Sequence, residues 1–353
     1  MCYIEHLKII LNFSEEPFVR KCLCLLLLCG LLLTGCGGKT AEPESNHDGL
    51  KIVATIFPAY DFARAAAGDM ADVELLLPPG TESHSYEPTP ADILAVQDCD
   101  LFVYLGGESD TWVETILESI EMRGTALRMI DCVELLEEEH VEGMQSSPGH
   151  SHDHDEEDCH EEHHHHEEED ELGLGRVVGM DEHVWTSPAN AAAITAAIGN
   201  KLAELDGKHA EGYVENAAAY AERILELDTA FHTFFDSLPN RTIVFGDRFP
   251  LRYFAQAYDL DYYAAFPGCG TQTEPSAATI AFLTGKIVDE NIPTIWYIEF
   301  SNHLVADSIA EAAKIDTAMF HTCHNVSKAD LEAGATYLSL MEKNLETLKI
   351  CMR

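Results

Sequence analysis

The sequence predicts an α/β protein with two lobes, each a mostly parallel sheet flanked by helices. Three observations support this fold class. The chain has 353 residues, which is enough for two medium-sized domains with separate cores. Apolar β-type runs alternate with helical segments in two stretches, as expected for parallel sheets covered by helices. A long helical region separates the two stretches, and no short repeat indicates a solenoid.

The first stretch predicts a sheet near the beginning of the mature chain. Short runs rich in β-branched and aromatic residues predict its strands. The expected strands are 51–56, 72–78, 100–106 and 125–130. The helices expected between them are 91–97 and 112–120.

Two helices are expected in the middle of the chain. The first spans 188–205, with Ser187 as its N-cap and a proline at its first position. The Asp-Gly pair at 206–207 ends this helix. The second helix spans 208–237 and would be roughly 45 Å long at 1.5 Å per residue.

Alternation of strands and helices resumes after this helical region. The expected strands are 242–246, 261–266, 294–300 and 317–320. The expected helices are 251–258, 276–291, 303–314 and 328–349. The predicted divisions are a signal peptide at 1–35, a flexible tether at 36–49, an N-terminal lobe at 50–187, connecting helices at 188–237 and a C-terminal lobe at 238–353.

Residues 1–35 are typical of a bacterial signal peptide. Their apolar run at 22–33 follows two basic residues and is too short to span a membrane comfortably. It ends in LTGC at 33–36, which resembles a lipobox, the signal in which the cysteine, here Cys36, receives a diacylglycerol. The alternative is an ordinary signal peptide with a chance cysteine. The expected protein is therefore extracytoplasmic and lipid-anchored to the bacterial cell membrane.

The net charge of −41 limits the partners of this chain. A nucleic acid needs a basic face, and so does electrostatic attachment to anionic lipid. The acidity instead favours cations as partners, or serves solubility alone.

One tract, at 150–171, concentrates potential metal ligands. Its 22 residues contain 8 His and 12 acidic residues, without Lys or Arg. It lacks apolar residues to bury, so a disordered loop is expected at about 137–171. Such a tract binds divalent cations weakly in many arrangements; the alternative is a solvated loop without a role. The histidines of this auxiliary metal loop are His150, His152, His154, His160, His163, His164, His165 and His166.

Four further groups are candidate ligands of a tighter metal site. They are His84 in a Pro- and Gly-containing loop, His183 just before a helix, Asp247 after strand 242–246, and the group His321, Cys323 and His324 after strand 317–320. Ligands of open parallel sheets bind beyond the carboxyl ends of the strands, so a cleft between the lobes could gather these groups. Imidazoles with a carboxylate suit a transition metal. The alternative is that each is an ordinary loop residue. Trp185 is expected to pack beside the site, and Glu299 to accept hydrogen bonds near it.

Four segments resemble the zinc/manganese solute-binding lipoproteins of bacterial ABC importers. They are ATIFPAYDFARAAAGD, LLLPPGTESHSYEPTPAD, DEHVWTSPANA and DGKHAEGYVENAAAYAERILELD, in this order. The resemblance implies two lobes joined by one rigid helix, 208–237, with the metal between them. It also implies a non-enzymatic, monomeric protein that delivers its ion to a permease and an ATPase. The implied ligands are His84, His183 and Asp247, with His324 preferred as the fourth and His321 or Cys323 as alternatives.

The expected cargo is Zn²⁺. Imidazole favours zinc, whereas Mn²⁺ prefers carboxylate oxygen and is less suited to this set. The first alternative is a manganese-specific protein of the same family. The second is a lipid-anchored metallo-hydrolase or oxygenase with a two-His, one-carboxylate site and Glu87 as general base. A third is an adhesin that uses the same fold.

Overall fold

The computed structural model describes residues 49–81, 86–107, 110–144, 179–268 and 274–352. These residues all belong to one unit, Gly49–Arg353. The predicted signal peptide, Cys36, His84 and the His-rich tract lie outside the described residues. No helix in the described ranges has both the length and the apolar character needed to cross a membrane.

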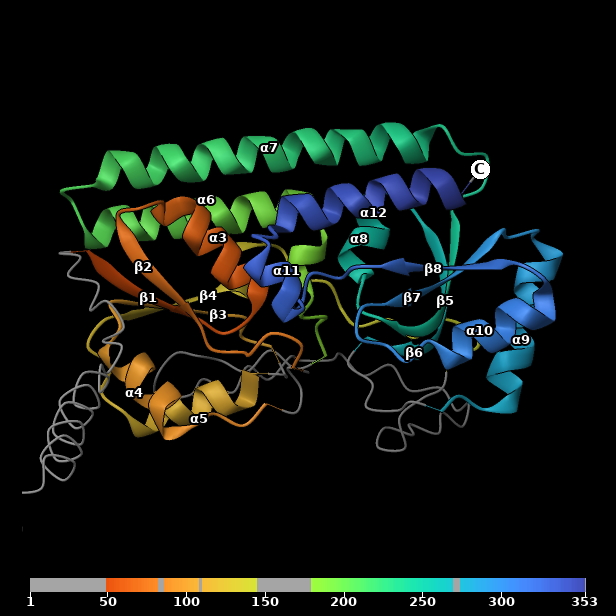
Figure 1. Ribbon diagram of the computed structural model, residues 1–353, viewed down its shortest axis with the longest axis horizontal. Helices are drawn as coiled ribbons and strands as arrows, with labels where there is room; N and C mark the ends of the chain where they lie inside the picture. Colours follow the sequence, from red (N-terminus) through yellow and green to blue (C-terminus); the bar gives the residue numbers. More distant parts are fainter. Residues whose placement is uncertain (1–48, 82–85, 108–109, 145–178, 269–273, 353) are drawn as a thin grey trace, which may run out of the picture. The chain divides into compact units, whose positions relative to one another are not determined.

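The N-terminal lobe is built on a four-stranded parallel sheet, as predicted (Figure 1). Its strands pair in the order β2-β1-β3-β4 and are β1 (Leu50–Ala54), β2 (Ala71–Leu75), β3 (Leu101–Tyr104) and β4 (Thr125–Arg128). Its helices are α3 (Phe57–Ala67), α4 (Pro90–Asp98) and α5 (Thr111–Ser119). Alternate side chains of the strands enter two cores: Ile52 packs with α3, whereas Val53 packs with α4 and α5.

The C-terminal lobe repeats this arrangement. Its strands pair in the order β6-β5-β7-β8, all parallel. They are β5 (Thr242–Phe249), β6 (Asp261–Pro267), β7 (Thr294–Ile298) and β8 (Asp316–Phe320). The helices between them are α8 (Arg252–Ala257), α9 (Ala277–Asp289) and α10 (Leu304–Ala313). Val244 packs in a core with α9 and α10, whereas its neighbour Phe245 packs on the opposite side.

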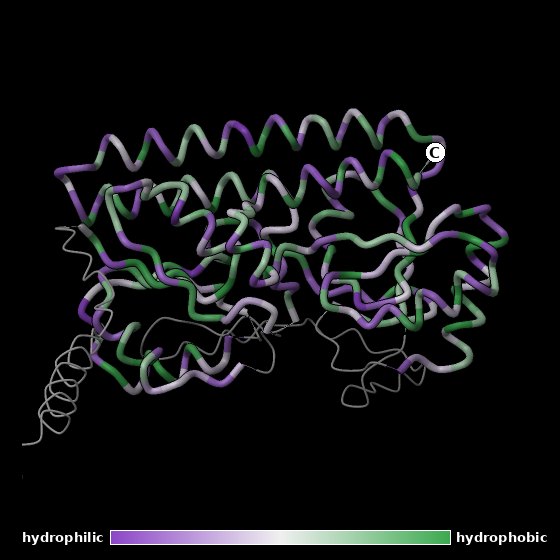
Figure 2. Tube along the Cα trace, in the orientation of Figure 1, coloured by the Kyte–Doolittle hydropathy of each residue, from purple (hydrophilic) through white to green (hydrophobic). Residues whose placement is uncertain are grey.

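The predicted long helix between the lobes is confirmed. It is α7 (Ala210–Asp236), and it follows α6 (Pro188–Leu205), whose N-cap is Ser187 as predicted. Helix α7 contacts α3 and α6 on the N-terminal side and α12 (Tyr337–Cys351) on the C-terminal side. Hydrophilic and hydrophobic residues alternate along it (Figure 2), as in a helix with one buried face. A Cβ on Gly199 would clash with Ala217 Cβ, so this glycine lets α6 and α7 approach closely.

Some element boundaries differ from the sequence prediction. The helix expected at 328–349 is two helices, α11 (Lys328–Glu332) and α12, because Gly334 adopts a left-handed φ of +76° between them. Helix α3 was not predicted from residue patterns. Strand β5 extends to Phe249, so Asp247 lies within the strand rather than after it.

The first residues of the loop that was expected to be disordered, 137–144, have a defined structure. Residues up to Met144 are described, and Glu137 forms an antiparallel bridge with Met180. Glu139 accepts a hydrogen bond from Tyr262 Oη at 3.0 Å and pairs with Arg252 at 3.2 Å. These contacts hold the start of the segment against the C-terminal lobe.

Candidate metal centre

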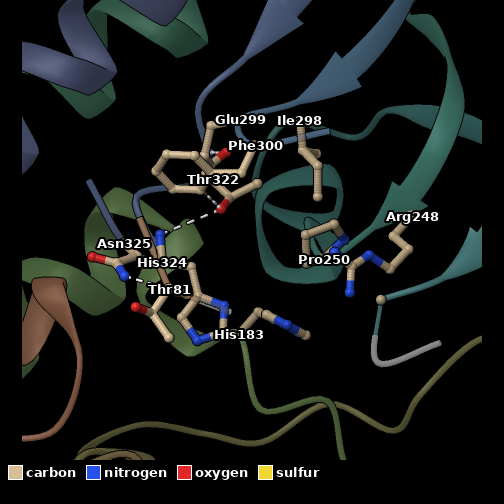
Figure 3. A pocket seen from close by; sticks show the side chains of 11 residues that line it. Thr81, His183, Arg248, Pro250, Ile298, Glu299, Phe300, Thr322, His324 and Asn325 are labelled. Atoms are coloured by element: carbon tan, nitrogen blue, oxygen red, sulfur yellow. Dashed lines mark hydrogen bonds between the residues drawn. The ribbon is translucent and has the colours of Figure 1, made fainter. Parts of the chain in front are cut away.

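A small cavity lies where residues from the two lobes meet (Figure 3). Its volume is about 40 Å³. The side chains that matter for its chemistry are the imidazoles of His183 and His324, the guanidinium of Arg248 and the carboxylate of Glu299. The cavity therefore combines donors from segments that are far apart in the sequence.

His183 is held in a fixed orientation beside this cavity. It is 1% exposed and immediately precedes the short 3₁₀ helix Val184–Thr186. Its backbone N–H donates to Asp181 Oδ1 at 2.8 Å, and its ring Nδ1 lies 3.0 Å from the same oxygen. This contact assigns the ring proton to Nδ1. Nε2 is buried and has no hydrogen-bond partner among the described residues, as expected for a nitrogen that takes a metal ion.

The surroundings of His183 have opposing effects on its proton affinity. Burial lowers the pKa of the imidazole, but the Asp181 carboxylate, through charge and its hydrogen bond, raises it, as do Glu182 and Glu138. The net effect is a raised pKa. Protons therefore compete with a metal ion for Nε2, so acid is expected to weaken binding.

His324 brings a second imidazole to the cavity from the loop after β8. Its ring centre lies 5.9 Å from that of His183 and 5.0 Å from that of Trp185. Its backbone N–H donates to Thr322 Oγ1 at 3.3 Å. Thr322 in turn donates through its N–H and Oγ1 to the two carboxylate oxygens of Glu299, at 2.7 and 2.6 Å. Glu299 thus fixes the turn that carries His324, which confirms it as a hydrogen-bond acceptor near the cavity.

Hydrogen bonds tie the two lobes together around the cavity. The Trp185 indole N–H donates to the backbone oxygen of Thr322 at 2.9 Å, and Tyr337 Oη donates to the backbone oxygen of Trp185 at 2.9 Å. The predicted packing of Trp185 beside the site is confirmed, since its ring centre is 5.5 Å from that of His183.

The loop that leads to His84 is attached to the opposite lobe. Asn325 Nδ2 donates to the backbone oxygens of Pro78 and Thr81, at 2.9 and 2.8 Å. Thr81 lines the cavity. His84 follows three residues later in the sequence and lies outside the described residues.

Gly268 makes room for the imidazole of His183. A Cβ at this position would lie 3.2 Å from His183 Cε1 and 3.1 Å from the backbone oxygen of Phe249. A larger residue would thus push against the ring. This role could not be predicted from the sequence, because the requirement for glycine comes from a contact between distant segments.

The structure places Asp247 differently from the sequence expectation. Its Oδ1 accepts the N–H of Arg248 at 2.8 Å, and its Oδ2 accepts the N–H of Ile298 at 3.4 Å. Arg248, not Asp247, lines the cavity. The pairing of β5 with β6 shifts between Phe245 and Arg248, and such a shift changes which side chains face a given direction.

The alternatives to His324, which are His321 and Cys323, do not line the cavity. His321 Nδ1 accepts the N–H of Cys323 at 3.0 Å, and the His321 N–H donates to Asn344 Oδ1 at 2.9 Å. Cys323 is fully buried in the main core, and this burial raises the pKa of its thiol well above the usual value. Glu87, the candidate general base, is exposed and does not line the cavity.

Two imidazoles are therefore the described donors of this site. No group of three His, Cys, Asp or Glu side chains in the described ranges could hold a metal ion. A complete coordination sphere needs at least one further ligand.

Two parallel-sheet lobes spanned by a long helix, with histidines from both lobes at a cavity between them, define a solute-binding protein of the metal-binding class. The family model described as "Zinc-uptake complex component A periplasmic" (ZnuA) matches residues 52–351. The chain belongs to this family.

Individual relatives agree with this assignment. The chain is 31% identical over 328 residues to "Zinc-binding lipoprotein AdcA" of Streptococcus pneumoniae R6, which covers 93% of this chain and 60% of that protein. It is also 31% identical over 333 residues to "High-affinity zinc uptake system protein ZnuA" of Bacillus subtilis, covering 93% of this chain and 96% of that one. The chain thus spans about three fifths of the pneumococcal relative.

Solved structures show the same fold. The Zn(II)-bound ZnuA-like domain of Streptococcus pneumoniae AdcA has a TM-score of 0.66 and 29% identity, with 86% of this chain and 99% of that domain covered. A laminin-binding adhesin of Streptococcus agalactiae has a TM-score of 0.67 at 21% identity over 86% of this chain and 100% of that chain, a likeness of fold alone.

Proposed function

We propose that this protein captures Zn²⁺ outside the cytoplasm and delivers it to the permease of an ABC importer, which is powered by an ATPase subunit. The observation that carries the proposal is the buried Nε2 of His183, which has no partner among the described residues and shares a cavity with His324 of the other lobe. The family assignment and the zinc-binding relatives support the same function.

The ligands proposed are His183, His324 and His84. Three neutral imidazoles suit zinc, whereas manganese prefers oxygen donors. The orientation of Asp247 does not favour it as a fourth ligand, because both of its oxygens accept backbone hydrogen bonds. Capture rather than hydrolysis is supported by the family assignment and by the position of Glu87, the candidate general base, which is exposed and does not line the cavity.

Membrane attachment and a reservoir of weakly bound ions complete the proposal. Cys36 would carry the lipid, as supported by the lipobox-like LTGC and by a relative named as a lipoprotein. The tract at 150–171 would hold additional ions weakly and keep them near the cavity, because its imidazoles and carboxylates are dense. A monomer suffices, since both described imidazoles come from one chain.

The direct test is native mass spectrometry of the chain from residue 37 with Zn²⁺ and Mn²⁺ in competition. We expect one tightly bound zinc ion. His183→Ala and His324→Ala should each lose it, while the control His303→Ala should retain it, because His303 is exposed and contacts Asp307. Deletion of 150–171 should remove only additional, weaker ions.

Two outcomes would overturn the proposal. The first is a tight ion that survives both His183→Ala and His324→Ala in a folded protein. The second is a wild-type chain that takes manganese in preference to zinc. If the tight ion is lost only when 150–171 is deleted, the tight binding site lies in the tract and not in the cavity.

A further inference from the structure

We propose that Tyr253 of the C-terminal lobe is a positioning residue for His183 and thereby helps to set the affinity of the cavity for its metal ion. This inference rests on the proposed function, because the positioning serves a metal ion bound at His183. Tyr253 does not line the cavity. It acts through Asp181, the residue whose carboxylate contacts the His183 ring at 3.0 Å.

Asp181 belongs to an antiparallel pair of short segments, 136–138 and 179–181, which we call the clasp. Backbone contacts join its two segments. They are the bridge of Glu137 with Met180, the hydrogen bond from Glu138 N–H to Gly179 O at 3.0 Å, and the hydrogen bond from Asp181 N–H to Leu136 O at 2.8 Å. The second segment leads to His183 within two residues, so the position of the Asp181 carboxylate depends on the clasp.

The hydroxyl of Tyr253 bonds to both segments of the clasp. Its Oη accepts the N–H of Leu136 at 3.1 Å and donates to the backbone oxygen of Asp181 at 2.8 Å. The side chain belongs to α8 of the other lobe and is 3% exposed. Burial raises the pKa of Tyr253 to about 12, so the hydroxyl retains the proton that it donates. One buried group of the C-terminal lobe therefore holds the clasp together.

The clasp is too small to keep its shape alone. An isolated two-stranded hairpin is only marginally stable in water, and the two segments share an isolated bridge rather than a ladder. Arg252 and Tyr262 contact Glu139, which adjoins the first segment. Tyr253 also reaches the second segment, which carries Asp181.

Helix α8 supports the chain on both sides of His183. Its Tyr253 bonds to Asp181 before the histidine, and the helix also contacts the 3₁₀ helix Val184–Thr186 after it. An imidazole of the N-terminal lobe is thus oriented by a helix of the C-terminal lobe. The orientation of this ligand therefore depends on the two lobes being in contact.

The chemical consequence of losing the hydroxyl follows from these contacts. Without it the N–H of Leu136 loses its partner, and leaving a polar group of the backbone unpaired favours a shift of the clasp. A carboxylate bonded to a ligating histidine fixes the tautomer and the orientation of the ring. A shift of Asp181 would therefore weaken metal binding although no ligand has been changed.

The test compares two tyrosines of the same lobe. The chain from residue 37 is titrated with Zn²⁺ against a competing chelator, and Tyr253→Phe should weaken the Kd by about tenfold. The matched control is Tyr262→Phe, which removes the same hydroxyl from a buried tyrosine that bonds to Glu139. Its Kd should stay within about twofold of the wild type. Thermal unfolding of each variant verifies that it is folded.

Two further measurements distinguish positioning from a general loss of stability. In the metal-free protein, ¹⁵N NMR of the His183 ring should show the proton on Nδ1 in the wild type and a mixture of tautomers in Tyr253→Phe. The double variant Asp181→Asn/Tyr253→Phe should bind zinc about as weakly as Asp181→Asn alone, because the two residues act on the ring through one contact.

The outcomes separate this inference from the proposed function. An unchanged Kd in Tyr253→Phe, an equal loss in Tyr262→Phe, or losses that multiply fully in the double variant would each overturn the inference and leave zinc capture intact. Absence of a tight zinc site in the wild type would overturn the proposed function. The NMR measurement needs no metal, so it would still decide whether Tyr253 orients His183.

Discussion

The two lobes have the same strand order but differ at the end of their first strand. In the N-terminal lobe β1 has five residues and pairs in regular register with both neighbours. In the C-terminal lobe β5 has eight residues, and its pairing with β6 shifts between Phe245 and Arg248. The difference shows that strand order determines where a cavity lies, whereas a local irregularity determines which side chain lines it.

The lobes also hold their imidazoles in different ways. His183 is oriented through its ring, by direct contact with Asp181. His324 is oriented through its backbone, by the hydrogen bonds that join Glu299 to Thr322 and Thr322 to the N–H of His324. Substitutions of the supporting groups should therefore have unequal effects in the two lobes.

The largest effect is expected where the two lobes are joined. Trp185→Ala removes a fully buried side chain and its hydrogen bond to Thr322, so it should lower the free energy of unfolding by about 3–5 kcal/mol. Urea unfolding measures this change. The control is Trp112→Ala, a partly exposed tryptophan that contacts Tyr86 within one lobe, and its cost should be smaller. Equal costs would show that Trp185 has no special role between the lobes.

A buried acid after the third strand of the N-terminal lobe gives a pH-dependent prediction. Asp110 Oδ2 accepts the N–H groups of Leu105 and Gly106, and burial, together with Glu182 and Glu114, raises its pKa to about 7. The folded state therefore retains a proton that the unfolded state loses near pH 4. Stability from this group is present below pH 4 and is lost as the pH rises through 7.

Asp110→Asn keeps an oxygen acceptor for these N–H groups but does not ionise. Relative to the wild type, it should gain stability on the order of a few kcal/mol as the pH rises from 4 to 8. Urea unfolding of both proteins across this range measures the gain. A constant difference between the two proteins would contradict a raised pKa at Asp110.

The next prediction compares Asp181 and Glu299, the residues whose hydrogen bonds orient His183 and His324. Asp181→Asn should weaken zinc binding by about 10–100-fold, because a carboxylate bonded to a ligating histidine fixes its tautomer and strengthens it as a donor. Glu299→Gln should weaken binding less, by about threefold, because it alters a turn rather than the ring itself. Calorimetric titration measures both. A larger loss for Glu299→Gln would reverse the proposed difference between the lobes.

The smallest effect is expected at Asp247, which the sequence predicted to be a metal ligand. Asp247→Asn should change zinc affinity by less than about threefold, because the carboxylate accepts backbone hydrogen bonds and does not line the cavity. The same titration applies. A loss of about 100-fold or more would restore Asp247 as a ligand.

Much of this architecture was predictable from local patterns. Apolar runs predicted all eight strands, and Ser187 with the proline after it predicted the start of α6. His183, expected just before a helix, and His324, expected after a strand, were both candidate ligands in the sequence, and both line one cavity. The break between α11 and α12 was not predicted, although Gly334 and the N-cap residue Thr336 gave a local signal for it.

Local patterns could not predict that Arg248, rather than Asp247, lines the cavity. Both residues follow the apolar run 242–246, and the pattern alone does not reveal that the strand continues through a shift in register. That shift depends on pairing with β6, which begins at Asp261, and on contacts with other elements. The role of Gly268 depends likewise on the ring of a distant residue.

The hydrogen bonds of Asn325 to Pro78 and Thr81 have a kinetic consequence. They join the two walls of the cavity, so a motion that separates the walls must first break these bonds. If release requires such a separation, the dwell time of an ion depends on the frequency of this motion as well as on the strength of its coordination. A membrane partner that separates the two walls would accelerate unloading without touching a single ligand.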